Sequence, residues 1–298
     1  MTQTAFIGLG NMGGGMAANL AKAGVSVRAF DLAAPAVERA VAAGCASAPT
    51  AGDAARGADV VITMLPAGAH VRSVLTESVF PNASAGALVI DCSTTDVETA
   101  REMAAKAREL GFRFADAPVS GGTAGAEGGT LTFMVGCDDQ DFAAVEQVLG
   151  AMGRAVIRAG GPGTGQAVKI CNNMLLGVSM LGVCEALNLA DALGLDAERF
   201  FEIASKSSGQ CWSLTSYCPV PQLVPAAPSN RNFEGGFSTA MMLKDLKLAQ
   251  SAAANSRVAT PMGAQAEALY ALFERLGYGG KDFSAAIKLL GGSLAELT

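Results

Sequence analysis

The stretch "TAFIGLGNMGGGMAANLAKAGVSVRAFD", residues 4–31, decides the fold of this chain. An apolar run leads into Gly8, Gly10 and Gly13, which have the spacing G-x-G-x-x-G, and a helix-like segment follows. A second apolar run then ends at Asp31. In a chain with 36 glycines the spacing alone is weak, but here it lies between a strand and a helix. That order, closed by an acidic residue, is the βαβ arrangement that binds dinucleotides.

Each residue of this pattern has its own expected role. Gly8 permits the tight turn, Gly10 lets the backbone approach the pyrophosphate, and Gly13 lets helix and strand pack closely. The helix N-terminus would face the phosphates with its partial positive charge. Asp31 would accept hydrogen bonds from the ribose hydroxyls and repel a 2′-phosphate, and Leu32 offers no cation to hold one. The pattern therefore predicts NAD rather than NADP as the cofactor.

Two later segments are expected at the same edge of the sheet. Leu65 and Pro66 end one apolar run in "MLPAGAHV", and Thr94 ends another in "DCSTT". Cofactors lie at the carboxyl ends of parallel strands. With the turn residues Asn11 and Met12, these side chains complete the predicted cofactor site. His70, which stands at the start of a helix just beyond, is interpreted as a solvated residue rather than a catalyst.

The pattern of the chain changes near residue 162. Residues 1–162 alternate apolar strands with helices, which predicts a parallel sheet covered on both faces, an α/β Rossmann-type domain. Residues 163–298 read as helices, beginning with one of roughly 25 residues or more. They predict an all-α domain for substrate binding and oligomerisation. The Pro- and Ser-rich stretch 211–236 is expected to be a long ordered loop.

Composition excludes several classes of protein. Of the 298 residues, 50% are apolar and 16% are charged, which favours buried cores over disorder. The net charge of −6 gives no footprint for nucleic acid. One histidine and seven cysteines without a CxxC pair argue against a metal site. With no leader-like N-terminus, and an apolar run that breaks at Glu185, too short to cross a bilayer, we expect a soluble cytoplasmic protein without membrane contact.

Two polar groups stand out from apolar surroundings. "GTGQAVKICNNMLLG", residues 163–177, puts Lys169 beside Asn172 and Asn173 on one predicted helix face. Taken alone, such a trio is usually solvated. "DAPVSGG", residues 116–122, places a serine before two glycines, a turn whose hydroxyl and backbone N–H groups suit a carboxylate. A flexible hairpin is the competing interpretation of that turn.

Taken together, these motifs are recognisable. "GLGNMG", "DAPVSGG" and "GTGQAVKICNN" occur in the order and spacing of the β-hydroxyacid dehydrogenase family, which the chain resembles over essentially its whole length. Within that family, "CWSLTSYCPVP", "NFEGGF" and "MMLKDLKLAQ" are most similar to the 3-hydroxyisobutyrate dehydrogenases. One departure is Gly15, where the family commonly has proline; the first helical turn is then less rigid, but the amides that face the phosphates remain.

The resemblance implies NAD-dependent oxidation of a 3-hydroxy acid to its semialdehyde, with 3-hydroxyisobutyrate in valine breakdown as the leading substrate. Lys169 matches the catalytic lysine that takes the hydroxyl proton; a lysine does this near neutral pH only where desolvation favours its neutral form. The matching substrate residues are Asn172, Asn173, Ser120, Gly121 and Gly122. Lys244 matches a lysine near the cofactor, with a surface ion pair as the competing interpretation. Trp212 and Phe237 are candidate pocket aromatics, although core packing is more usual for such residues.

Other functions stay open at this point. The same chemistry could act on serine, tartronate semialdehyde, or succinic or glyoxylic semialdehyde, because one methyl group changes binding by only ~1–3 kcal/mol. Imine reductases share the architecture, but Lys169 and Asp31 argue against placing this chain among them. A non-catalytic dinucleotide-binding module is the rival from another class. The long apolar helix has more surface than one small domain covers, so we expect a homodimer or homotetramer.

Overall fold

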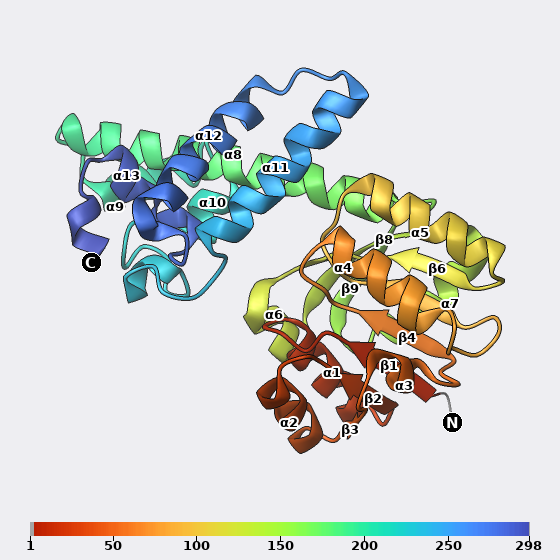
Figure 1. Ribbon diagram of the computed structural model, residues 1–298. Coiled ribbons are helices and arrows are strands. Elements are labelled where there is room, and N and C mark those ends of the chain that lie inside the picture. Colours follow the sequence, from red (N-terminus) through yellow and green to blue (C-terminus); the bar gives the residue numbers. More distant parts are fainter. Residues whose placement is uncertain (1–2, 298) are drawn as a thin grey trace. The chain divides into compact units, whose positions relative to one another are not determined.

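The computed structural model describes residues 3–297. By internal contacts the chain divides into two compact units, one up to Lys169 and one from Ile170 onward. Figure 1 shows the α/β character of the first unit and the all-helical character of the second. The predicted fold, a Rossmann-type domain followed by a helical domain, is confirmed.

The first unit is built on a nine-stranded sheet. Its strands are β1 (Gln3–Ile7), β2 (Ser26–Phe30), β3 (Ala46–Ser47), β4 (Val60–Thr63), β5 (Leu88–Asp91), β6 (Arg113–Asp116), β7 (Val119–Ser120), β8 (Leu131–Cys137) and β9 (Gly153–Gly160). The order is β3-β2-β1-β4-β5-β6-β8-β7, with β9 also paired to β8. The six strands β3, β2, β1, β4, β5 and β6 pair in parallel. The chain leaves β1 for β2 on one side and returns to β4 on the other, so the switch point lies between β1 and β4, where such sheets bind ligands.

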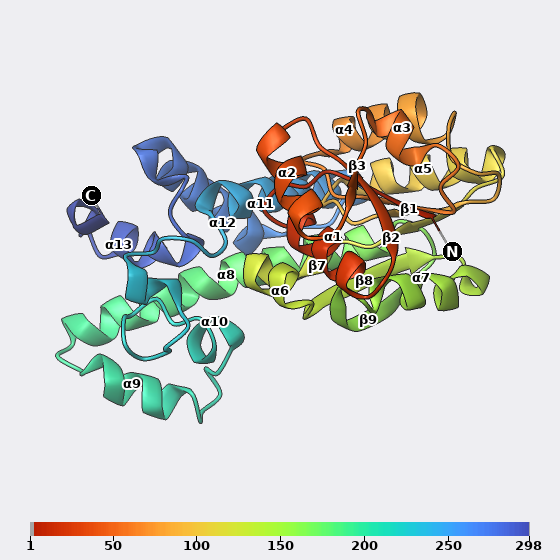
Figure 2. The ribbon, with the colours of Figure 1, turned by 90° about the horizontal axis from the view of Figure 1, so that it is seen from below.

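Helices cover both faces of this sheet, as its continuous apolar strands require. They are α1 (Gly13–Lys22), α2 (Ala34–Ala42), α3 (Ala51–Ala55), α4 (Gly68–Ser73), which continues into a π-helical turn (Val74–Val79), α5 (Val97–Glu109), α6 (Gly122–Gly128) and α7 (Phe142–Leu149), which follows a 3₁₀ turn (Asp139–Asp141). Figure 2 shows α3, α4 and α5 on one side of the sheet and α7 on the other. Alternate strand residues pack into two separate cores: Phe6 lies with the α1 and α7 side chains, and Ala5 and Ile7 with those of α3 and α5.

The second unit is helical throughout. Most of α8 (Thr164–Ala192) belongs to it, followed by α9 (Ala197–Ala204), α10 (Trp212–Thr215), a 3₁₀ turn (Pro228–Arg231), α11 (Thr239–Ser256), α12 (Pro261–Phe273), a π-helical turn (Glu274–Tyr278), a 3₁₀ turn (Phe283–Ala285), α13 (Ala286–Leu290) and a last 3₁₀ turn (Leu294–Leu297). Its core includes Met180 and Leu187 of α8 and Leu246 of α11. Gly177 lets α11 approach α8, because a Cβ there would lie 3.1 Å from the sulfur of Met242.

Two expectations need correction. The stretch 211–236 is not wholly loop, since it contains α10 and the 3₁₀ turn, both too short to produce a helical period in the sequence. The apolar run interrupted at Glu185 lies within the 29-residue α8, which is long and apolar enough to cross a membrane by length and composition. A buried core helix passes the same test. The buried Gln166, Lys169 and Asn173 along α8 support the core-helix interpretation.

Candidate functional site

The glycine turn after β1 has the geometry that its spacing predicts. Gly8 has φ +96°, and a Cβ there would lie 2.3 Å from the carbonyl oxygen of Met64, so only glycine fits between β1 and the end of β4. A Cβ at Gly13 would lie 2.0 Å from the Gly8 oxygen, so α1 packs directly against the turn. Gly10, in contrast, has no atom within 4 Å of its Cβ position. The open side of the turn is therefore at Gly10, next to the exposed Asn11 and the half-buried Met12.

Asp31 holds this turn in place. One carboxylate oxygen accepts a hydrogen bond from the Leu9 backbone N–H at 2.6 Å, and the other accepts from the Ala33 N–H at 2.8 Å. Each oxygen keeps a second lone pair for a ribose hydroxyl. Leu32 beside it is 94% exposed. A tight turn, an open approach at Gly10 and a fixed carboxylate together fit the adenosine half of a dinucleotide.

The loops after β4 and β5 are joined at the same edge of the sheet. The Ser93 hydroxyl accepts from the Leu65 N–H at 2.8 Å and donates to Asp91 at 2.6 Å. Asp91 also accepts from the Thr63 hydroxyl at 2.8 Å, and burial raises the pKa of its carboxyl group. The predicted residues of these loops, Pro66 (exposed) and Thr94 (half-buried), thus stand on a rigid base.

Lys169 is buried beside the serine–glycine turn. Its side chain is 7% exposed, and its Nζ donates to the Val119 carbonyl oxygen at 2.8 Å. Ser120 follows directly at the end of β7 and is half-buried. Gly121 and Gly122 have φ values of +134° and +63°, which side chains rarely tolerate. The turn therefore needs both glycines to run from β7 into α6, and it brings Lys169 and the predicted carboxylate site together.

The first turn of α8, which carries Lys169, is fixed by two residues that the sequence interpretation did not single out. Asp116, at the end of β6, accepts from the Gly163 N–H at 2.6 Å and from the Gln166 N–H at 2.8 Å, so it caps the helix N-terminus. Burial raises the pKa of Asp116 to about 6. The Gln166 side chain donates to the Ser93 carbonyl at 2.7 Å and accepts from the Thr95 N–H at 3.1 Å. Asp116 lies in the motif "DAPVSGG" and Gln166 in "GTGQAVKICNN". Their positions in these motifs were the one feature of the sequence that could have identified them.

In the second unit, Asn173 is held by a carboxylate. Its Nδ2 donates to Asp245 of α11 at 2.5 Å, and its Oδ1 accepts from the exposed Asn172 at 2.9 Å. Asn173 and Asp245 are 2% and 4% exposed. Lys244 beside Asp245 is half-buried. The sequence alone did not predict that Asp245 binds Asn173. Because Asn173 is four residues after Lys169, both side chains leave the same face of α8.

Gly15 contributes by packing rather than by helix stiffness. A Cβ there would lie 2.9 Å from the carbonyl carbon and oxygen of Ala126, so α6 approaches the backbone of α1. The Asn19 side chain on the next turn of α1 donates to the Ala126 carbonyl at 2.7 Å. Helix α6, which begins at Gly122, is therefore anchored to the helix that begins at the predicted phosphate site.

The remaining candidates have simpler environments. His70 is exposed, which confirms its interpretation as a solvated residue. Trp212 is 52% exposed and stacks on Tyr217 at 4.9 Å between ring centroids. Phe237 meets Phe283 edge to face at 5.8 Å. Both candidate pocket aromatics thus belong to the aromatic cluster of the second unit.

Known families match both parts of the chain. Residues 3–161 match the NAD-binding domain of 6-phosphogluconate dehydrogenase, and residues 163–290 match the NAD-binding domain of NADP-dependent 3-hydroxyisobutyrate dehydrogenase. The NAD-binding character predicted from the glycine turn is confirmed.

Three relatives extend this over nearly the full length. The NAD-dependent L-serine dehydrogenase of Pseudomonas aeruginosa is 48% identical, covering 97% of this chain and 98% of the relative. The 3-hydroxyisobutyrate dehydrogenase of the same organism is 46% identical, covering 98% and 99%. A solved structure of 3-hydroxyisobutyrate dehydrogenase from Mycobacterium tuberculosis with L-serine superimposes with a TM-score of 0.93 at 46% identity, covering 97% and 99%. The chain is therefore an NAD-binding hydroxyacid dehydrogenase and belongs to the 3-hydroxyisobutyrate dehydrogenase family.

Proposed function

We propose that this chain oxidises the primary alcohol of a small 3-hydroxy acid, with NAD preferred over NADP and 3-hydroxyisobutyrate as the first candidate substrate. That activity would belong to valine breakdown. The observation that carries the proposal is the burial of Lys169 against the Val119 carbonyl, one residue before the Ser120–Gly122 turn. A buried lysine beside a turn that offers a hydroxyl and backbone N–H groups suits a substrate that has a carboxylate near its hydroxyl.

In the proposed reaction each residue has one task. Lys169 Nζ takes the proton of the substrate hydroxyl, so that the C–O bond becomes the carbonyl of a semialdehyde. Bound NAD would supply the hydride acceptor. The Ser120 hydroxyl has no hydrogen-bond partner among residues 3–297, and with the N–H groups of Gly121 and Gly122 it would bind the substrate carboxylate. Asn173, oriented by Asp245, would hold the substrate from the same helix face as Lys169.

L-Serine is the second candidate substrate, and a specific observation favours it. One relative is named for L-serine, and the similar solved structure is described with L-serine. L-Serine and 3-hydroxyisobutyrate share the carboxylate and the CH₂OH group and differ at C2, which carries an ammonium group in one and a methyl group in the other. The groups proposed above address only the shared part. We rank 3-hydroxyisobutyrate first because the C-terminal segments 211–221, 232–237 and 241–250 resemble the dehydrogenases named for it.

The test compares kcat/KM for (S)-3-hydroxyisobutyrate and L-serine with NAD, in the wild type and in Lys169→Ala. Removing a general base costs roughly 10²–10⁴-fold in rate, so we expect kcat to fall in that range while NADH binding, followed by its fluorescence, is unchanged. Lys206→Ala is the matched control, because Lys206 is 76% exposed in a surface ion pair with Glu202. Full activity in Lys169→Ala would contradict the assigned role. Faster turnover of L-serine would replace the first substrate by the second.

A further inference from the structure

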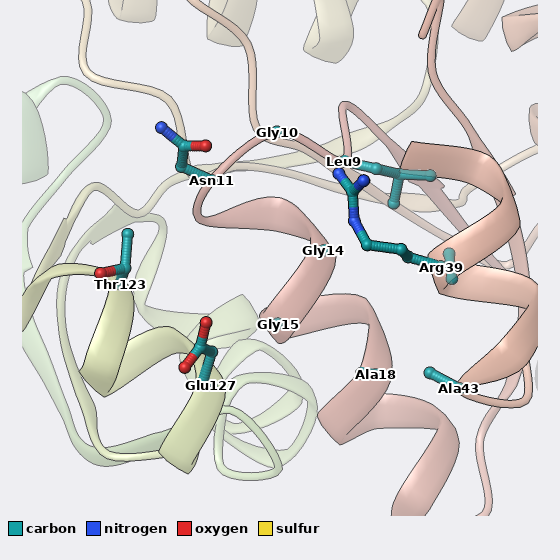
Figure 3. A pocket seen from close by; sticks show the side chains of 11 residues that line it. Leu9, Gly10, Asn11, Gly14, Gly15, Ala18, Arg39, Ala43, Thr123 and Glu127 are labelled. Carbon is teal, nitrogen blue, oxygen red and sulfur yellow. The ribbon is translucent and has the colours of Figure 1, made fainter. Parts of the chain in front are cut away.

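A cavity of about 460 Å³ lies beside the glycine turn, within the first unit. Its floor is α1, with Gly14, Gly15 and Ala18. One wall is α2 and the opposite wall is α6, as Figure 3 shows. The cavity reaches Leu9 and Gly10, which belong to the turn that approaches the cofactor. It therefore adjoins the glycine turn of the predicted cofactor site.

Two charged side chains line this cavity, and they face it from opposite walls. Arg39 comes from α2 and Glu127 from α6. Figure 3 shows the Arg39 side chain extending toward the Leu9–Gly10 turn, with Glu127 beyond α1 on the α6 side. Arg39 is exposed, and among residues 3–297 it has no ion-pair or hydrogen-bond partner. The α2 end of the cavity thus presents an unpaired cation, and the α6 end presents an anion.

The cavity that Arg39 lines also reaches the turn held by Asp31, the residue expected at the ribose. Leu9 lines the cavity with Arg39, and its N–H is bound to the Asp31 carboxylate at 2.6 Å. Because the other Asp31 oxygen is bound to the Ala33 N–H, Asp31 cannot turn away from a ligand without breaking backbone hydrogen bonds. A phosphate on the ribose 2′-oxygen would be repelled by this fixed carboxylate. On the α2 side it would meet the guanidinium of Arg39, whose planar fork suits phosphate oxygens.

We propose that Arg39 is a specificity-determining residue that binds the 2′-phosphate of NADP, so that this chain accepts NADP as a second cofactor despite Asp31. The residue directly after Asp31 is Leu32, which has no positive charge. Arg39 is eight residues after Asp31, inside α2, and the fold returns it to the turn. The inference rests on the NAD-binding site and not on the identity of the hydroxy acid.

The experiment measures binding of NADPH and NADH to the full-length protein by isothermal titration calorimetry, without substrate. A charge-assisted bond to phosphate at an exposed site predicts that Arg39→Ala weakens NADPH binding by about tenfold and changes NADH binding by less than about twofold. Lys22→Ala is the matched control, since Lys22 is an exposed cation on α1 outside the cavity. It removes the same charge and should leave both affinities unchanged.

Adenosine 2′,5′-bisphosphate and 5′-AMP repeat the comparison with the adenosine half alone. If Arg39→Ala weakens the binding of the bisphosphate but not of 5′-AMP, the proposal is supported. An equal loss of NADPH and NADH would instead mean that Arg39 contacts a group common to both, such as adenine, and would overturn it. Unchanged NADPH binding in Arg39→Ala, or wild-type protein that binds NADPH no better than the variant, would overturn it as well. None of these outcomes depends on which hydroxy acid is oxidised.

Discussion

Replacement of Asp116 by asparagine tests how the first turn of α8 is held. The two Asp116 oxygens accept from Gly163 N–H and Gln166 N–H. Asparagine has nearly the same shape but only one acceptor oxygen, so one of these buried N–H groups loses its partner. That loss costs about 1–3 kcal/mol of stability at any pH. The substitution also removes a buried negative charge, and this second effect depends on pH.

The pH-dependent part follows from the pKa of Asp116, which burial raises from 3.8 to about 6. The folded chain therefore binds the proton more tightly than the unfolded chain. The stability contributed by this carboxyl group is fully present below about pH 3.8 and is lost as the pH rises through 6. Complete ionisation costs on the order of 3 kcal/mol, of which roughly 2 kcal/mol falls between pH 4.5 and 7.5. Asparagine does not ionise, so the variant escapes this loss.

The assay is urea unfolding of the wild type and Asp116→Asn at several pH values from 4.5 to 7.5, at one protein concentration. The free energy of unfolding of the variant relative to the wild type should rise by about 2 kcal/mol across this range. This rise does not depend on how much the two proteins differ in stability at the lowest pH. Asp91 is present in both proteins, and its negative charge is the weakest of the causes that shift the pKa of Asp116. Asp196→Asn, which alters the cap of the exposed end of α9, is the control. Parallel stability curves for the wild type and Asp116→Asn would refute the reasoning.

Two further predictions concern packing and a buried amide. Gly15→Ala puts a methyl group 2.9 Å from the backbone of Ala126 and should lower the free energy of unfolding by about 1–3 kcal/mol. Gly182→Ala, in a helical position with open space around it, should raise the free energy of unfolding by roughly 0.5–1 kcal/mol. Equal effects of the two substitutions in urea unfolding would contradict this difference. Gln166→Leu leaves a buried carbonyl and a buried N–H without partners and should cost about 2–4 kcal/mol in the same measurement. An unchanged midpoint would show that water replaces both bonds.

The architecture could be predicted because it depends on the local spacing of apolar residues along the chain. Apolar runs alternate with helical segments up to residue 162, and that order specifies a parallel sheet with both faces covered. The glycine turn was predictable for the same reason, since Gly8, Gly10 and Gly13 act within a few residues of one another. Helix α10 was not predictable, because four residues carry no helical period. The long helix predicted at roughly 25 residues or more is α8, which has 29 residues.

The supports of the site were missed because they act across long sequence separations. Asp116 binds backbone groups 47 and 50 residues away, and Gln166 bridges to loop residues 71 and 73 positions earlier. Asn173 and Asp245 are 72 residues apart. Residue type at one position says nothing about such partners until the topology brings them together. Arg39 was missed for a related reason. It lines the same cavity as Leu9 and Gly10 only because the fold places α2 beside the glycine turn.

The polar residues of α8 show why the motif lysine alone does not make the site. A buried lysine, glutamine or asparagine in an apolar helix is unfavourable unless each polar atom finds a partner. Lys169 finds the Val119 carbonyl, Gln166 finds the loop after β5, and Asn173 finds Asp245. The direction of each side chain is therefore set by its partner as well as by the helix. A chain that retained Lys169 but lost Asp116 or Gln166 would keep the lysine while releasing the helix turn that aims it.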